Sequence, residues 1–317
     1  MSSKRGWKLT VPDYPALALP THGPLALAVS GGGDSLGMLA LALHDQRERL
    51  TVLTVDHALR TDSAADAAHV EAICAQQRVP CRVLRLDWGG APPAGNRQSA
   101  ARRQRYRALT DACGHSAIPY LLTAHHLDDQ AETVLMRLSR GSGVTGLSGI
   151  RAQRRLSADV TLLRPCLHLT SDTLHAAAAA AGFAVREDPS NRDPAYDRTR
   201  YRALLNEVQL DAARLAASAA HLADADAALD WAAELAFQSR SVEGSSEGRG
   251  QYLNLDLAGL PSELRRRMLL RAFAALRAPV PRGPALVDFM ERLDSGGTAQ
   301  LSGLRGRGGA RWTLWSE

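Results

Sequence analysis

The chain has 317 residues, 45% of them hydrophobic and 22% charged, and a formal net charge of +5. This length suits about two domains with ordinary cores. The N-terminal residues contain no long apolar run, so we expect neither a signal peptide nor a membrane span. The four cysteines form no C-x-x-C pair, which indicates reduced thiols in a cytoplasmic protein rather than a disulfide framework or a zinc site.

The most informative stretch is Leu25 to Ser35, which reads LALAVSGGGDS. Its continuous apolar start predicts a strand buried on both faces, and residues 36–44 after the glycines have a helical pattern. Glycines let the backbone approach a phosphate closely, and the N–H groups of a helix N-terminus favour negative charge. The order therefore predicts a phosphate site. The alternative is a tight turn in which Asp34 or Ser35 only caps the helix.

Asp34 distinguishes this loop from the Walker phosphate loop, which has a lysine before its Ser or Thr. A carboxylate beside a bound phosphate is repelled unless a cation lies between them. Asp34 therefore indicates a Mg²⁺ ligand.

Further strands are expected at 51–55, 81–86 and 120–124, separated by helical patterns at 63–77 and 98–112. This alternation predicts a doubly wound parallel sheet, with ligands at the carboxyl ends of its strands. Asp56-His57 and His125-His126 follow two of these strands directly. They are candidate ligand contacts for that reason.

A second dense signal is the helical segment that begins near Leu127, where Asp128, Asp129 and Glu132 lie three or four residues apart on one face. Acids in a first turn often only complement the helix dipole. With two adjacent histidines, however, the cluster favours Mg²⁺ or a cationic substrate, and a zinc site is the weaker alternative. The glycine-rich stretch 141–149 is either an ordinary connection or a flap over substrate.

Arginines dominate the helix from Gln98, where Arg102 and Arg105 can cluster with Tyr106. Solvated arginines are the usual case, and contact with nucleic-acid phosphates is the functional alternative. Residues 187–202 combine acids, arginines and tyrosines as either a polar turn or a nucleotide or RNA contact.

The last third predicts a separate module. A helical pattern over 204–237 carries an apolar residue every seven positions from Val208 to Leu229, which suits a bundle helix or a homodimer seam. Residues 239–250 have the composition of a flexible linker. Beyond them we expect a small α+β unit whose arginines are either solvated or bind RNA. The expected domains are 1–203 and 204–317.

SGGGDS resembles the SGGxDS loop of the PP-loop ATP pyrophosphatases, and the wider series of motifs resembles the tRNA(Ile)-lysidine synthetase family. The matching stretches occur in the family's order: SGGGDS, VDHALR, AARRQRY, TAHHLDDQAETVLMRLSRGSG, GLSGI, LLRPCL and EDPSNRDPAYDRTRYR. The resemblance covers nearly the whole chain. It implies an α/β fold: a Rossmann-like PP-loop domain with a doubly wound parallel sheet, then a long helix and a smaller α+β accessory domain that binds tRNA.

The resemblance also implies a reaction. ATP adenylates C2 of the wobble cytidine in a tRNA(Ile) with a CAU anticodon, free L-lysine attacks that carbon, and lysidine, AMP and pyrophosphate result. The alternative is another PP-loop tRNA-modifying enzyme, such as a tRNA cytidine thiolase. Thiolases of that group typically depend on a cysteine pair, which this chain lacks as a C-x-x-C motif.

Roles are carried over residue by residue. Asp34, Asp129 and Glu132 would be catalytic, with Asp34 and Glu132 as Mg²⁺ ligands. ATP would contact Ser30, Gly31, Gly32, Gly33, Asp34, Ser35, Asp56, His57 and His125. The tRNA would contact Arg102, Arg105, Arg198 and Arg202. Ala58 stands where the family usually has Gly, and Ser171 and Thr199 replace a common Arg and Asn; we expect the first to be harmless and the others to alter only fine RNA contacts.

Overall fold

The computed structural model describes residues 16–58, 63–89, 97–186, 197–246, 250–281 and 283–316. Two compact units, 1–221 and 222–317, divide the chain within helix α8. The first contains β1 (Leu25–Ala28), α1 (Gly33–Gln46), η1 (Arg47–Arg49), β2 (Leu50–Asp56), α2 (Ser63–Gln77), β3 (Cys81–Arg85), α3 (Arg97–His115), β4 (Tyr120–Leu122), α4 (Leu127–Leu138), α5 (Val144–Leu147), β5 (Gln153–Arg155), β6 (Thr161–Leu163), α6 (Ser171–Ala180) and α7 (Asp197–Glu207). From α8 (Ala212–Arg240) the chain continues through β7 (Ser241–Ser246), β8 (Gly250–Leu255), α9 (Ser262–Ala275), α10 (Pro284–Asp294), β9 (Thr298–Leu301), β10 (Leu304–Arg307) and β11 (Trp312–Ser316).

The first unit is built on a six-stranded sheet in the order β3-β2-β1-β4-β6-β5. All neighbours are parallel except β5, which runs antiparallel to β6 at the edge. The central strand β1 is buried, as its unbroken apolar sequence predicts. The doubly wound α/β fold is confirmed, and β5 is an addition that the sequence pattern did not indicate.

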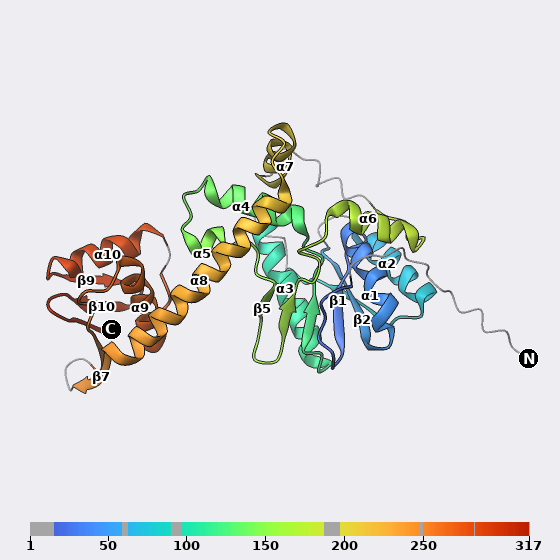
Figure 1. Cartoon of the computed structure of the whole chain (residues 1–317). Coiled ribbons are helices and arrows are strands. Elements are labelled where there is room, and N and C mark those ends of the chain that lie inside the picture. Colours follow the sequence, from blue (N-terminus) through green and yellow to red (C-terminus); the bar gives the residue numbers. More distant parts are fainter. Residues whose placement is uncertain are drawn as a thin grey trace, which may run out of the picture. The chain divides into compact units, whose positions relative to one another are not determined.

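Helices cover both faces of this sheet. α1, α2 and α6 share one hydrophobic core with β1 and β2, and α3 packs on the other face against Leu53, Leu121 and Leu162 (Figure 1). Close packing of α1 on α6 requires glycine at one position. A Cβ at Gly37 would overlap the backbone of Leu174.

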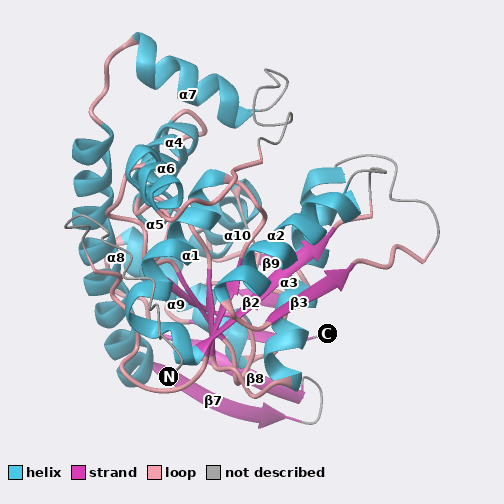
Figure 2. Cartoon of the chain, turned by 90° about the vertical axis from the view of Figure 1, so that its right-hand side faces the viewer, coloured by secondary structure: helices cyan, strands magenta, loops and turns pink. Residues whose placement is uncertain are grey.

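The second unit contains a five-stranded antiparallel sheet in the order β7-β8-β11-β10-β9. Its core includes Leu253 and Leu255 of β8, and Phe273 and Phe289 of helices α9 and α10. The linker expected at 239–250 is wrong, because most of this stretch forms β7 and the start of β8, which pair as a hairpin (Figure 2). The expected α+β module is confirmed.

The long helix is shorter than its sequence pattern indicates. α7 ends at Glu207 and α8 begins at Ala212, so Val208 lies in neither helix and is 55% exposed. The buried positions of α8 are Ala219, Asp226 and Ala233, which keep the expected spacing of seven on a different set of residues. A homodimer and the functional division at 203/204 both stay predictions. None of the helices in the described ranges combines the length and apolar composition that a membrane-spanning helix needs.

Candidate active site

The glycine loop leaves the start of α1 open. The Ser35 hydroxyl accepts a hydrogen bond from the Ser30 N–H at 3.1 Å and donates to the Gly32 carbonyl at 2.9 Å. Gly31 has φ +88°, a conformation that favours glycine. Gly32 is the N-cap and no side chain caps the helix, so the simple capping alternative for Asp34 and Ser35 is wrong. The N–H groups of the first turn can therefore bind an anion.

Only part of the glycine run leaves room for a phosphate. A Cβ on Gly32 would meet nothing nearer than the Ser30 hydroxyl at 3.8 Å, whereas a Cβ on Gly33 would overlap the ring of His175. Gly33 is therefore required by packing against α6. Gly32 is the position that lies open at the mouth of the loop.

An acidic cluster surrounds His126, at the carboxyl end of β4. Its Nε2 lies 3.6 Å from carboxylate oxygens of Asp34 and Asp129, and its Nδ1 lies 3.2 Å from Asp128. The His126 side chain is only 3% exposed, while Asp34 is 38% exposed. Asp129 also accepts a hydrogen bond from the His126 backbone N–H at 3.2 Å, which fixes the start of α4.

His126 carries a positive charge at neutral pH. Burial by itself lowers the pKa of His126, but the close contact with Asp34 and the charges of Asp129, Asp34 and Asp128 outweigh it and raise the pKa to about 9. Burial raises the pKa of Asp34, and the contacts with His126 and Ser171 outweigh that effect, so its pKa lies below the ordinary value. The sequence offered both His125 and His126 as candidate ligand contacts, and the family resemblance gave a role in ATP binding to His125 alone. His125 instead contacts the Thr123 hydroxyl at 2.9 Å.

The N-terminus of α6 completes this cluster. The Ser171 hydroxyl donates to Asp34 at 2.8 Å, and its backbone N–H donates to Asp128 at 2.9 Å. His175 lies 3.5 Å from Asp34, one turn further along α6. Ser171, whose replacement of the family's common Arg was expected to alter only fine RNA contacts, therefore touches the candidate catalytic acid. The sequence contains no local pattern that reveals this contact, because 137 residues separate Ser171 from Asp34.

Glu132 faces the same sheet edge from the next turn of α4. Its side chain is 2% exposed, and one carboxylate oxygen accepts a hydrogen bond from Arg202 Nε at 2.7 Å. Burial lowers the pKa of Arg202, but Glu132, Asp129 and Asp34 together raise it above the ordinary value. The structure thus brings Asp34, Asp129, Glu132 and Arg202 together. Tyr201 and Ser139, whose hydroxyls are 2.5 Å apart, form a second link between α7 and α4.

Two further predicted ATP contacts hold the loop after β2. Asp56 is buried and accepts hydrogen bonds from the Ala58 N–H at 2.9 Å and the Ser63 hydroxyl at 2.5 Å. The hydrogen bond from Ser63 is the main reason that the pKa of Asp56 lies below its usual value. The His57 carbonyl accepts from Trp88 at 2.9 Å. Ala58 has φ +49°, where a side chain costs about 1–2 kcal/mol, so this departure from glycine carries strain.

Tyr106 positions the two candidate RNA contacts on α3. The guanidinium groups of Arg102 and Arg105 lie 5.2 and 5.6 Å from the centre of the Tyr106 ring, as expected from their spacing. Arg198 belongs to α7, but its side chain lies outside the described residues.

The glycine-rich stretch 141–149 is anchored on the acidic helix. It contains α5, and Arg137 donates to the carbonyls of Gly146 and Gly149 at 2.6 and 3.0 Å. Gln130 brackets Ile150, donating to its carbonyl at 3.1 Å and accepting from its N–H at 2.5 Å. The helix that carries Asp129 and Glu132 therefore holds the second half of this stretch, and a flap over substrate stays a prediction.

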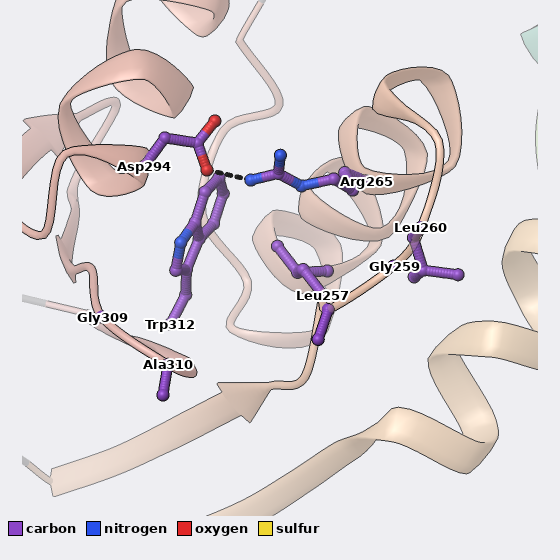
Figure 3. A pocket seen from close by; sticks show the side chains of 9 residues that line it. Leu257, Gly259, Leu260, Arg265, Asp294, Gly309, Ala310 and Trp312 are labelled. Atoms are coloured by element: carbon purple, nitrogen blue, oxygen red, sulfur yellow. Dashed lines mark hydrogen bonds and ion pairs between the residues drawn. The ribbon is translucent and has the colours of Figure 1, made fainter.

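The second unit has a cavity of about 310 Å³ beside Trp312. Arg265 lies 5.1 Å from the centre of the Trp312 ring and is ion-paired with Asp294 (Figure 3). The neighbouring arginines of α9 also pair with acids: Arg266 with Glu263, Arg267 with Asp226, Asp230 and Glu263, and Arg271 with Glu234. These side chains hold the unit together. RNA contacts from α9 are therefore poorly supported.

Comparison with known proteins agrees with this geometry. A family model described as a PP-loop domain matches residues 10–209. The tRNA(Ile)-lysidine synthase of Novosphingobium aromaticivorans is 42% identical, over 91% of this chain and 87% of the relative. The enzyme of the same name from Zymomonas mobilis is 36% identical, over 94% of this chain and 90% of its own.

Among solved structures, the U34-tRNA thiolase NcsA from Methanococcus maripaludis, which holds a [4Fe-4S] cluster, is similar in fold. It has a TM-score of 0.51 and 16% identity, and the match covers 63% of this chain and 70% of the thiolase. This likeness supports the α/β architecture alone. The family match and the sequence identities show more: the chain belongs to the tRNA(Ile)-lysidine synthase family of PP-loop, ATP-dependent ligases.

Proposed function

We propose that the chain joins free L-lysine to C2 of the wobble cytidine in a tRNA(Ile) with a CAU anticodon. ATP first adenylates the cytidine with loss of pyrophosphate, and the lysine amine then displaces AMP to leave lysidine. The observation that carries the proposal is the acidic cluster of Asp34, Asp129 and Glu132 beside an open phosphate loop. A site that handles both ATP and a cationic amino acid needs both features.

The loop from Ser30 to Ser35 would hold the ATP phosphates with its backbone N–H groups. Mg²⁺ fits this site, because it is commonly held by one or two carboxylates together with substrate phosphates. Asp34, which is partly exposed at the loop, and Glu132 are the candidate ligands. No group of three or more metal-binding side chains converges within the described ranges. When bound, the ion would offset charge on the departing pyrophosphate.

Asp129 and Glu132 would bind the lysine amine and accept the proton that it loses as it attacks. In the structure Arg202 neutralises Glu132 at 2.7 Å. Its guanidinium must move from that carboxylate before Glu132 can bind a second cation. Arg202 is half-exposed and donates from Nε alone, whereas Glu132 is 2% exposed, so the incoming cation must compensate the buried carboxylate as Arg202 leaves.

The tRNA would contact Arg102 and Arg105 on α3 and Arg198 and Arg202 on α7. Arginine suits this role because its guanidinium forks onto phosphate. These assignments rest on the family resemblance and on the exposed position of Arg102.

The test is incubation with ATP, Mg²⁺, labelled lysine and a CAU-anticodon tRNA(Ile). We expect label in that RNA and none in methionine tRNA. Asp34→Asn should lower the rate by more than roughly a hundredfold, because the electrostatic stabilisation lost is several kcal/mol. Asp159→Asn, in an exposed turn, is the matched control. Sulfur transfer to the tRNA in place of lysine would support the thiolase alternative and contradict the proposal.

A further inference from the structure

Arg164 is a buried cation that the proposed reaction does not use. It follows β6 directly and is 7% exposed. One guanidinium nitrogen donates to the Arg151 carbonyl at 2.5 Å, while its Nε is buried and makes no hydrogen bond. A buried charge without an ionic partner costs free energy unless something compensates for it.

Other arginines lie around Arg164, where a carboxylate would be expected. Burial lowers the pKa of Arg164, and the charges of Arg102 and Arg154 lower it further. Within the described part of the chain, no ion pair joins Arg102, Arg154 or Arg164 to an acid. The positive charges of Arg102, Arg154 and Arg164 therefore repel one another without a carboxylate of the described residues to offset them.

Strand register explains why these side chains meet. Arg154 pairs with Leu162 across the β5–β6 ladder, so both point to the same face. Arg164 is two residues beyond Leu162 and shares that face as well. Leu162 packs against α3, and Tyr106 lies at the border of the same core. The three elements β5, β6 and α3 therefore direct their cations to one place.

Tyr106 forms the centre of this group. Arg102 lies over its ring at 5.2 Å, which holds that guanidinium in position without a carboxylate. The Tyr106 hydroxyl is close enough to raise the pKa of Arg164, but it is buried and makes no hydrogen bond of ordinary geometry. The Tyr106 hydroxyl and the Arg164 guanidinium therefore face each other, and Arg102 and Arg154 supply the further positive charge around them.

We propose that Arg102, Tyr106, Arg154 and Arg164 form a binding site for a phosphate group of the tRNA backbone; this inference rests on the proposed tRNA substrate. Convergent guanidinium groups recognise phosphate through paired, charge-assisted hydrogen bonds. The site lies at the carboxyl edge of the sheet, on the α3 face, whereas the glycine loop opens onto α1 and α6. It would position the anticodon strand and leave ATP binding to the loop.

Arg154→Gln is the decisive variant, since Arg154 is exposed and its replacement leaves the core intact. The affinity for the CAU-anticodon tRNA(Ile) is measured without ATP over a series of KCl concentrations. We expect binding to weaken about tenfold at low salt, because a charge-assisted hydrogen bond is lost, and the salt slope to fall by about 1. Arg102→Gln should act in the same way, and the affinity for ATP should not change in either variant.

Arg155→Gln is the matched control. Arg155 neighbours Arg154 on β5, points to the opposite face and donates to the Ser157 carbonyl at 3.1 Å within its own turn. Equal salt slopes for Arg154→Gln, Arg155→Gln and the unmodified protein would overturn the phosphate site. A loss of ATP affinity in Arg154→Gln would assign the group to ATP phosphates instead, which also overturns it. If the salt slope falls in Arg154→Gln and not in Arg155→Gln, but the unmodified protein transfers no lysine to the tRNA, the proposed reaction fails and the RNA site stands.

Discussion

Each unit of the protein contains one buried cation surrounded by three carboxylates. In the first unit His126 lies among Asp34, Asp128 and Asp129 at 3.2–3.6 Å. In the second, Arg267 binds its three acids at 2.6–2.7 Å, and each of its three nitrogens donates a hydrogen bond. Both cations are 3% exposed.

The difference lies in how completely each cation is satisfied. Arg267 cannot lose its proton and all three of its nitrogens donate hydrogen bonds, so its cluster is closed and serves stability. His126 can titrate, its acids lie at longer distances, and Asp34 is open to solvent. The same composition can therefore build either a structural brace or a site that still has capacity for a ligand.

Arg267→Ala should give the largest loss of stability. It leaves Asp226, which is 1% exposed, as a buried charge without its main partner, and breaking such a pair costs about 3–5 kcal/mol. A parent that keeps buried Trp312 as its only tryptophan, with the other four replaced by phenylalanine, reports on the unfolding of this unit by fluorescence in urea. The double variant Asp226→Leu with Arg267→Met should recover most of the loss. If the free energy of unfolding of Arg267→Ala lay within about 1 kcal/mol of the parent value, well below the cost of breaking a buried pair, the cluster would not be a structural brace.

The contribution of the His126 cluster to the unfolding free energy of the first unit should instead depend on pH. The folded pKa of about 9 lies above the ordinary value of 6.5, so the stabilisation is fully present below pH 6.5 and is lost as the pH rises through 9. At 1.36 kcal/mol per pKa unit, the unfolding free energy of the first unit should fall by up to about 3 kcal/mol over this range. His126→Gln should flatten the change.

The second unit is the internal control for that measurement, because Arg267 does not titrate in this range. Urea unfolding at several pH values is therefore followed by circular dichroism, which reports on both units, and the Trp312 fluorescence identifies the part of the transition that belongs to the second unit. A stability of the first unit that is flat or rises from pH 6.5 to 9 would contradict the charge assigned to His126.

The fold of the first unit could be predicted because its signals are local. An unbroken apolar run specifies β1, and the glycines specify the turn into α1. The missed strands β5 and β7 have the polar sequences QRR and SVEGSS. They are strands because a neighbouring strand pairs with them, and such pairing leaves no periodicity in the sequence.

Local spacing also explains which parts of the site could be predicted. Asp129 and Glu132 share a helix face by their separation alone, and Asp34 follows the glycines directly. The choice between His125 and His126 depends on the path of the backbone at the end of β4, which adjacent identical residues do not reveal. Likewise, the arginines of α9 could not be distinguished from RNA contacts, because their partners Asp230 and Glu234 lie on α8, far away in sequence.

Arg266→Gln should give the smallest loss of stability, and it compares an exposed with a buried arginine most directly. Arg266 and Arg267 are adjacent and both bind Glu263 at 2.7 Å, but the Arg266 side chain is 33% exposed and that of Arg267 only 3%. We expect a loss of about 0.2–1 kcal/mol that shrinks as salt is added, because water and ions screen an exposed pair. Urea unfolding at low and high KCl measures it. A loss as large as that of Arg267→Ala would mean that the shared carboxylate, and not burial, determines what an arginine contributes here.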